Sequence, residues 1–297
     1  MKINYLDLFS GIGGFAEGLV QAGFEFNYHA FSEVDKNAIK VYEHHFPNSI
    51  NLGDIKNVFQ ESLREKINLI TFGFPCQDMS IVGKGRGFEG NRSSLFFEAM
   101  RIIEFTRPNY IIFENVKGLL TNNRGREWLS CLRELANIGY DGQWQLCNTG
   151  WILPQDRYRV YFVGYPRGTS RPRIFPIEGT ERDNFKEKEM GGLHTPPICT
   201  QKVFIPIIAT SSSVDLEGKL ESYARMHKQE KDLKFLNENL DNIELRRLTH
   251  VECERLQGFK DGWTSMISPS ERYKCIGNAV SVPIVELITK KLLLEWK

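Results

Sequence analysis

Residues 3–16, INYLDLFSGIGGFA, decide the fold of this chain. Their first part, residues 3–9, is a short apolar run typical of a buried strand. The run ends in the turn Ser10-Gly11-Ile12-Gly13-Gly14, and residues 15–22 then have the apolar spacing of a helix that Gly23 closes. A strand, a turn spaced Gly11-x-Gly13-x-x-Ala16 and a helix match the fingerprint of a nucleotide-binding βαβ unit, whose glycines let the backbone approach a ligand closely.

Strand-like and helix-like stretches alternate along the rest of the first half. Further strands are predicted at residues 28–31, just before Gly53, and at 68–72, 110–113, 144–147 and 160–163. Helices are predicted at residues 36–46, 93–105 and 126–137. This order predicts an α/β fold with a Rossmann-like, mostly parallel twisted sheet, which binds ligands outside the carboxyl ends of its strands.

The character of the chain changes after residue 164. Residues 165–245 contain several prolines and serine clusters such as Ser211-Ser212-Ser213, and they predict a second, smaller and irregular domain. Helical patterns return at residues 248–258 and 283–296. Residues 1–164 and 246–297 are therefore predicted to form one catalytic and cofactor-binding domain, interrupted by the domain at 165–245.

Two carboxylates follow the glycine turn at suitable distances. Glu33 comes 20 residues after Gly13, at the end of the next predicted strand, where a carboxylate can accept hydrogen bonds from ribose hydroxyls. Asp54 follows the third predicted strand and can accept from an adenine amino group. The turn alone does not choose between a nicotinamide cofactor and S-adenosylmethionine, because both carry adenosine.

The segment Gly73-Phe74-Pro75-Cys76-Gln77 follows another predicted strand. Pro75 stiffens the turn that presents the Cys76 thiol, because its ring fixes φ and restricts Phe74. The loop that follows is rich in glycine and carries Lys84, Arg86 and Arg92. Such a loop can close over an anion such as a phosphodiester.

Three more groups fall at the same edge of the predicted sheet. Glu114 ends the strand at residues 110–113, and Arg157 and Arg159 lie on one face of the strand that begins with them. Two guanidiniums on one face can hold a phosphate or a base carbonyl. The segment Gly277-Asn278-Ala279-Val280 is predicted to open the last helical region and to touch the cofactor.

Composition narrows the class of protein. The net charge is +1, so a nucleic-acid partner has to meet a local basic surface. Six cysteines without a C-x-x-C pair, no secretory signal and no membrane span predict a cytoplasmic protein with reduced thiols. His44-His45 is predicted on a helix surface, and the spacing of His250 and Cys253 predicts a packing contact rather than a metal site. A monomer is expected.

These segments, in this order, resemble the DNA cytosine-5 methyltransferase family of bacteria and phage. The segments that carry the resemblance are 7–15, Glu33, Asp54, 75–77, 114–116, 155–159, 246–259 and 277–280. His250 and Lys260 depart from it, since members of the family often have proline there. The resemblance covers residues 1–165 and 246–297, and it implies that residues 165–245 recognise the target sequence.

The resemblance implies S-adenosylmethionine as methyl donor, S-adenosylhomocysteine as product and duplex DNA as substrate, with a separate restriction enzyme as a possible companion. It implies that Cys76 adds to carbon 6 of a flipped-out cytosine, that Glu114 acts on ring nitrogen 3, that Arg159 holds the base carbonyl and that Arg157 supports the site. The implied cofactor-binding residues are Phe9, Gly11, Gly13, Gly14, Glu33, Asp54, Ile55, Pro75, Asn278 and Ala279. The implied DNA-binding residues are Gln77, Ser80, Lys84, Arg86 and Arg92.

Three other functions stay open at this point. A branch of the same family acts on tRNA with the same catalytic motifs, and residues 165–245 would decide between the substrates. A nicotinamide-dependent oxidoreductase is supported by the glycine turn and Glu33, but it leaves Cys76 and Glu114 without a role. A DNA-binding protein without catalysis leaves the same two residues unexplained.

Overall fold

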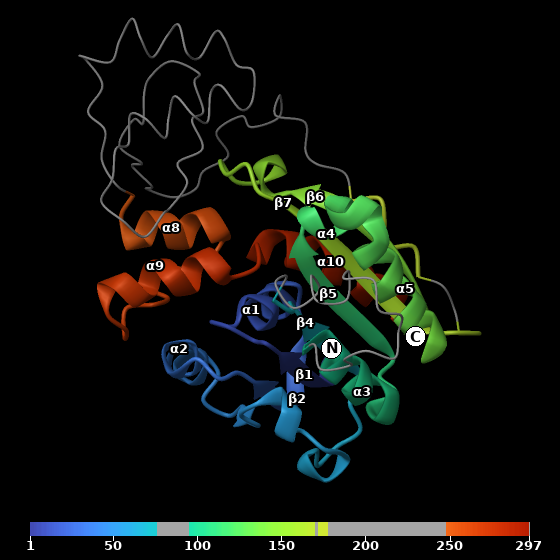
Figure 1. Ribbon diagram of the computed structural model, residues 1–297. Coiled ribbons are helices and arrows are strands. Elements are labelled where there is room, and N and C mark those ends of the chain that lie inside the picture. Colours follow the sequence, from blue (N-terminus) through green and yellow to red (C-terminus); the bar gives the residue numbers. More distant parts are fainter. Residues whose placement is uncertain (76–94, 170–171, 178–247, 297) are drawn as a thin grey trace, which may run out of the picture.

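The computed structural model describes residues 1–75, 95–169, 172–177 and 248–296. A seven-stranded sheet forms its centre, in the order β3-β2-β1-β4-β5-β7-β6 (Figure 1). The strands are β1 (Lys2–Leu8), β2 (Glu25–Ser32), β3 (Ile50–Asn51), β4 (Leu69–Phe72), β5 (Tyr110–Val116), β6 (Tyr140–Asn148) and β7 (Tyr158–Pro166). Strands β1 to β5 pair in parallel, whereas β7 pairs antiparallel with both β5 and β6. The predicted mostly parallel α/β sheet is therefore confirmed.

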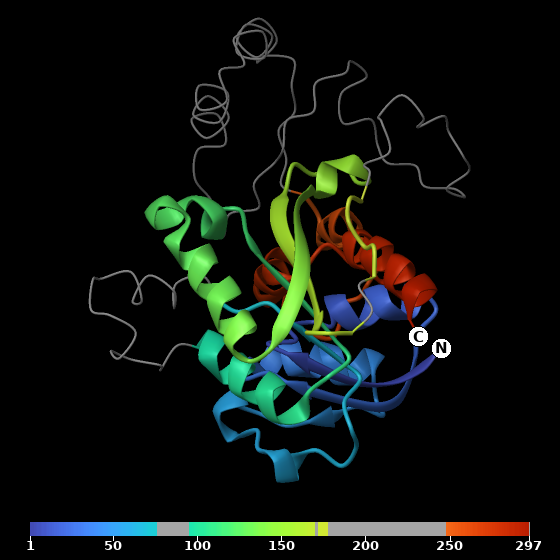
Figure 2. The same cartoon turned by 90° about the vertical axis from the view of Figure 1, so that its right-hand side faces the viewer.

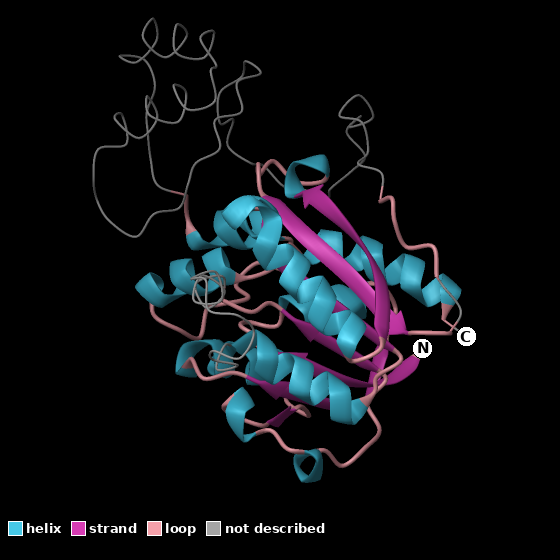
Figure 3. Cartoon of the chain, turned by 45° about the vertical axis from the view of Figure 1, so that its right-hand side comes forward, coloured by secondary structure: helices cyan, strands magenta, loops and turns pink. Residues whose placement is uncertain are grey.

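Helices connect the strands and follow them at the C-terminal end (Figure 3). Those of the first half are α1 (Gly14–Gln21), α2 (Lys36–His45), α3 (Leu95–Thr106), α4 (Gly118–Thr121) and α5 (Arg126–Asn137). Those of the last part are α8 (His250–Gln257), α9 (Pro269–Asn278) and α10 (Val282–Glu295). Short 3-10 turns are η1 (Ile55–Asn57), η2 (Gln60–Ser62), η4 (Asn122–Gly125) and η5 (Thr149–Trp151).

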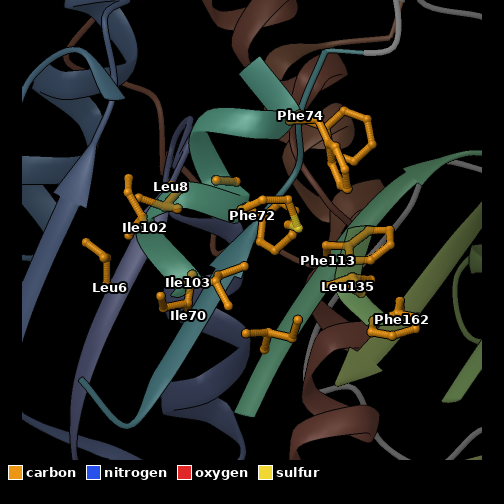
Figure 4. Packing of buried hydrophobic residues seen from close by; sticks show 14 of the residues in the cluster. Leu6, Leu8, Ile70, Phe72, Phe74, Ile102, Ile103, Phe113, Leu135 and Phe162 are labelled. Carbon is orange, nitrogen blue, oxygen red and sulfur yellow. The ribbon is translucent and has the colours of Figure 1, made fainter. Parts of the chain in front are cut away.

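The sheet is the middle of three layers (Figure 2). On one face, side chains of α3, α4 and α5 pack against apolar residues of β4 and β5, among them Phe72 and Phe113 (Figure 4). On the other face, α1 and α10 pack against Tyr5, Leu69 and Ile112. Because both faces are covered, β4 is buried at every residue, and its sequence, LITF, is mostly apolar without a strict alternation of polar and apolar residues.

Helices α8 and α9 form a third cluster with the glycine turn and α2. Trp263, in the connection between these helices, donates its indole N–H to the carbonyl of Ile12 at 2.9 Å. His45 stacks on Trp263 with ring centroids 3.5 Å apart. The prediction that His44 and His45 lie on a helix surface is therefore wrong for His45, because α2 packs against the C-terminal segment there.

Two of the differences from the predicted element boundaries bear on the site. Strand β5 continues through Val116, so Glu114 lies within the strand and pairs with Tyr161 of β7. The segment 277–280 does not open the last helix. Gly277 and Asn278 end α9, a helix that was not predicted, and α10 begins at Val282. Pro269 in the first turn of α9 is a local sequence signal for the start of this helix.

The two departures from the family pattern have local partners. His250 is the first residue of α8, and Thr249 and Glu252 form a capping box at the start of this helix. The Nε2 atom of His250 lies 3.0 Å from the carbonyl oxygen of Pro269. The Lys260 ammonium lies 3.3 Å from the buried carboxylate of Glu17. The segment therefore keeps a regular helix start and a tight contact with α1.

Candidate active site

The glycine turn after β1 uses backbone conformations that favour glycine. Gly11 and Gly13 have φ values of +54° and +86°. A Cβ atom on Gly13 would lie 2.8 Å from the Phe46 ring, whereas one on Gly11 would meet nothing within 4 Å. The turn is thus packed closely at Gly13 and open at Gly11. Phe9 also has a positive φ (+53°). Its side chain packs at the edge of the apolar cluster that α3, α4 and α5 form with β4 and β5.

Glu33 fastens this turn to the end of β2. One carboxylate oxygen accepts from the backbone N–H of Gly11 at 2.8 Å, and the other accepts from Val34 and Asp35 at 2.8 and 2.9 Å. A carboxylate has about four acceptor positions, so one remains for a ligand hydroxyl. Glu33 therefore shapes the turn, a role the sequence did not reveal, and still has capacity for a ribose.

Asp54 lies further along the same edge of the sheet. One of its oxygens accepts from the Lys56 N–H at 3.0 Å, and Ser32 donates to the Gly53 carbonyl at 2.7 Å. This bond ties the loop that carries Asp54 to the end of β2. Ile55 is buried among apolar side chains, so it can meet a ligand through its backbone only.

The connection between α9 and α10 packs on the glycine turn. A Cβ atom on Gly14 would lie 2.8 Å from a methyl group of Val280. Ala279 is buried and Asn278 is exposed. The segment 277–280 thus reaches the glycine turn, although it does not begin a helix.

Glu114 lies beside Gly73, the first residue of the cysteine loop, which is the segment 73–77 that contains Cys76. A Cβ atom on Gly73 would be 3.6 Å from its Oε2 atom, and Asn115 donates its side-chain N–H to the Phe74 carbonyl at 3.0 Å. Pro75 is exposed at the end of this described stretch. Two successive residues of β5 therefore contact the backbone that leads to Cys76, one from each face of the sheet.

Arg159 pairs with Glu114 across the strands. Its Nε lies 3.0 Å from Oε1 of Glu114, although the N–H is not aligned for a hydrogen bond. Burial raises the pKa of Glu114 above its ordinary value, and Arg159 and then Arg157 oppose that rise. Burial is the larger effect, so Glu114 is easier to protonate than an exposed glutamate.

Arg157 bridges β7 and the C-terminal segment. Its guanidinium donates to the carbonyls of Gly277 at 3.3 Å and Ala279 at 2.7 Å. Burial lowers its pKa, and an arginine nevertheless stays charged at neutral pH. Arg157 thus joins the Glu114 side of the site to the segment that packs on the glycine turn.

Six residues predicted to act on substrate lie outside the described residues: Cys76, Gln77, Ser80, Lys84, Arg86 and Arg92. Two other residues were given no separate role. Asn115 anchors the cysteine loop, and Tyr161, opposite Glu114, has a buried hydroxyl without a hydrogen-bond partner. In the sequence, Asn115 directly follows Glu114, and Tyr161 lies two residues after Arg159. These positions next to the predicted site residues could have indicated both.

Neither a metal cluster nor a membrane span occurs in this same part of the chain. No group of three or more histidine, cysteine, aspartate or glutamate side chains among the described residues is arranged to hold a metal ion. Among the described helices, none has both the length and the apolar character that crossing a bilayer requires.

Fold and site together define a class of enzyme. A largely parallel sheet carries a glycine turn with an acidic partner, and a buried glutamate and two arginines lie further along the same edge. A profile of the C-5 cytosine-specific DNA methylase family matches residues 3–232 and 202–294. The chain belongs to this family, and it is a DNA (cytosine-5) methyltransferase.

Relatives named as type II methyltransferases align with nearly the whole chain. The type II methyltransferase M.NgoBI of Neisseria gonorrhoeae is 33% identical over 96% of this chain and 91% of its own length. M1.ScrFI of Lactococcus lactis subsp. cremoris is 32% identical over 98% of this chain and 78% of its own length.

Solved structures share the fold at lower identity. A putative DNA modification methyltransferase encoded within an E. coli prophage has a TM-score of 0.65 at 18% identity, over 98% of this chain and 99% of that one. The Dnmt2 methyltransferase of S. pombe has a TM-score of 0.64 at 19% identity, over 99% and 98% of the two chains.

Proposed function

We propose that this enzyme methylates carbon 5 of cytosine within a specific sequence of duplex DNA, with S-adenosylmethionine as donor and Cys76 as covalent nucleophile. The single observation that supports it best is the surroundings of Glu114. This carboxyl is buried between Gly73, at the start of the cysteine loop, and the Arg159 guanidinium. A glutamate whose pKa is raised by burial suits the donation of a proton or hydrogen bond to a cytosine ring.

The residues at the glycine turn fit an adenosine-bearing donor. Open space lies over Gly11, and the Ser10 hydroxyl is buried without a partner. Glu33 keeps one acceptor position and Asp54 one carboxylate oxygen for the ribose and the adenine. When bound there, S-adenosylmethionine supplies the methyl group, and S-adenosylhomocysteine is the product.

Cys76 supplies the nucleophile in this scheme. Carbon 5 of cytosine is too weak a nucleophile until the Cys76 thiolate forms a bond to carbon 6 and makes the ring electron-rich. Glu114 donates its proton to ring nitrogen 3 and so neutralises the charge that develops there. After methylation, carbon 5 loses its proton to a base and the bond between Cys76 and carbon 6 breaks, which frees the thiolate. Ring nitrogen 3 returns its proton to Glu114, so that the neutral aromatic ring and the enzyme are both restored.

The arginines hold the base and the site together. Arg159 donates to the carbonyl oxygen of the cytosine while its Nε stays close to Glu114. Arg157, bonded to the carbonyls of Gly277 and Ala279, fixes the position of the strand that carries Arg159. Because these groups cannot reach a base stacked inside a duplex, the target base is flipped out.

The substrate class is tested by transfer of labelled methyl from S-adenosylmethionine to duplex DNA of mixed sequence and, in parallel, to tRNA. Sequencing that reports 5-methylcytosine then maps the product. Methylation confined to one short DNA motif is expected. Transfer to tRNA and to no duplex would overturn the proposed substrate and favour the RNA-modifying alternative.

A further inference from the structure

An exposed pair of side chains extends beyond the catalytic end of β5 and β7. The two strands pair as far as Val116 and Arg159. One residue further, the Lys117 ammonium lies 5.1 Å from the centre of the Tyr158 ring, a cation–π contact. Tyr158, the first residue of β7, is 40% exposed. Neither residue takes part in the chemistry proposed above.

Lys117 begins a segment of one charge sign. Residues 117–126, KGLLTNNRGR, contain three cations and no acidic residue. Lys117, Arg124 and Arg126 are all exposed, and none forms an ion pair within the residues that the structure describes. We call residues 117–126 the basic turn. Since the whole chain has a net charge of only +1, this segment is a local concentration of positive charge.

The basic turn is compact, so its charges act together. A Cβ atom on Gly118 would lie 3.4 Å from the Asn122 amide, and one on Gly125 would lie 3.3 Å from the Leu120 carbonyl. The next acidic residue, Glu127, is buried and accepts from Asn123 at 2.7 Å. Its carboxylate therefore faces inward, while the cations of the turn face solvent.

The turn lies at the right distance from the reacting base. Lys117 is three residues beyond Glu114, or about 10 Å along an extended backbone. The base that meets Glu114 belongs to a nucleotide whose phosphates must lie outside the buried site, at about that range. Figure 1 shows α4, within the turn, close to the end of β5 and the beginning of β7.

We propose that the basic turn and Tyr158 bind the phosphodiester backbone of the duplex beside the flipped cytosine. This inference rests on the proposed function, because it takes duplex DNA as the substrate. Lys117, Arg124 and Arg126 contact phosphates, which fixes the register of the strand without reading its sequence. Tyr158 holds the Lys117 ammonium and packs on the sugar-phosphate surface.

The test compares two triple variants that lose the same charge. Lys117→Gln/Arg124→Gln/Arg126→Gln removes the cations of the basic turn. Lys2→Gln/Arg64→Gln/Lys66→Gln removes three exposed cations at or before the amino ends of β1 and β4, at the opposite edge of the sheet. For both variants and the wild type, the dissociation constant for a methylatable duplex is measured against salt concentration. Binding of S-adenosylmethionine is measured as a check on folding.

The basic-turn variant is expected to bind duplex more weakly, with a salt dependence shallower by about 0.9 in log–log slope for each phosphate that it no longer neutralises. The control triple variant keeps the wild-type slope, and both keep the affinity for S-adenosylmethionine. If the wild type methylates duplex DNA but the basic-turn variant keeps the wild-type salt slope, the basic turn does not bind the DNA backbone. A wild type that methylates no duplex would instead overturn the proposed function, and this surface with it.

Tyr158 is tested separately, because its ring carries no charge. Tyr158→Ala is expected to weaken duplex binding without changing the salt slope, and Tyr158→Phe, which keeps the ring, is expected to match the wild type. Equal affinities for Tyr158→Ala and the wild type would remove Tyr158 from the surface.

Discussion

The side-chain N–H of Asn115 donates to the carbonyl of Phe74 at 3.0 Å, two residues before Cys76. Glu114, the preceding residue, faces the other side of β5 and pairs with Arg159. A single strand therefore both anchors the backbone that leads to the proposed nucleophile and carries the proposed acid. Successive side chains of a strand point to opposite faces of the sheet. Two neighbouring residues of β5 can therefore hold the Phe74 backbone on one face and pair with Arg159 on the other.

Asn115→Asp is expected to lower the rate constant of methyl transfer by about 100-fold, since a carboxylate cannot donate to the Phe74 carbonyl and a misplaced nucleophile costs about that much. The measurement is single-turnover methyl transfer to duplex DNA. Binding of S-adenosylmethionine should be unchanged, which separates a displaced loop from an unfolded protein. A wild-type rate in this variant would mean that the loop is positioned by other contacts.

Glu114→Gln is expected to lower kcat by roughly 10²- to 10⁴-fold, the usual contribution of a general acid. In the wild type, kcat should fall as the pH rises through the pKa of Glu114, because the protonated form is the active one. Burial places that pKa above the ordinary glutamate value. The check is the pH profile of kcat. If the variant loses activity but keeps the same alkaline fall, another group causes the fall.

Asp7→Asn is expected to change how stability depends on pH. Asp7 is fully buried, accepts from Thr71 at 2.8 Å and from Tyr42 at 3.1 Å, and burial raises its pKa from 3.8 to about 7. Between these values the folded protein holds a proton that the unfolded chain has lost. The wild type therefore loses stability as the pH rises from about 4 to about 7, by about 4 kcal/mol at 1.36 kcal/mol for each pKa unit.

Urea unfolding at pH 5 and pH 8 measures this effect. The difference in unfolding free energy between wild type and Asp7→Asn should shift in favour of the variant at pH 8. The same difference at both pH values would show that Asp7 titrates normally.

Gly18→Ala is expected to destabilise the fold by roughly 1–3 kcal/mol, the usual cost of overpacking. A Cβ atom there would lie 2.6 Å from a methyl group of Val285, where α1 crosses α10. Val20→Ala, at a 42% exposed position of the same helix, is the control and should have little effect. Thermal unfolding compares them. An unchanged Tm for Gly18→Ala would show that α10 moves to make room.

Much of the site was predictable because its motifs follow strand ends. Gly11, Glu33 and Asp54 come after successive strands, and parallel strands bring their carboxyl ends to one edge. The strong apolar runs of β1 and β4 and the helical spacing of α5 made those elements clear.

The parts that sequence missed depend on tertiary contacts. Helix α9 has a weak apolar pattern, and its position follows from packing with α8 and with the glycine turn through Trp263. His45 looked like a surface residue because its partner Trp263 is more than 200 residues away. The position of Arg157 against Gly277 and Ala279 has the same origin, since local patterns carry no information on such distant pairs.

The covalent role of Cys76 is the central claim, and a stalled reaction tests it most directly. A duplex with 5-fluorocytosine at the methylated position carries fluorine where a proton has to leave, so the enzyme cannot release carbon 6. Incubation with S-adenosylmethionine, followed by mass spectrometry of the peptides, should show the methylated base attached to Cys76, and Cys76→Ala should give no adduct while it still binds S-adenosylmethionine. Normal methyl transfer by Cys76→Ala, or an adduct at another residue, would contradict this role.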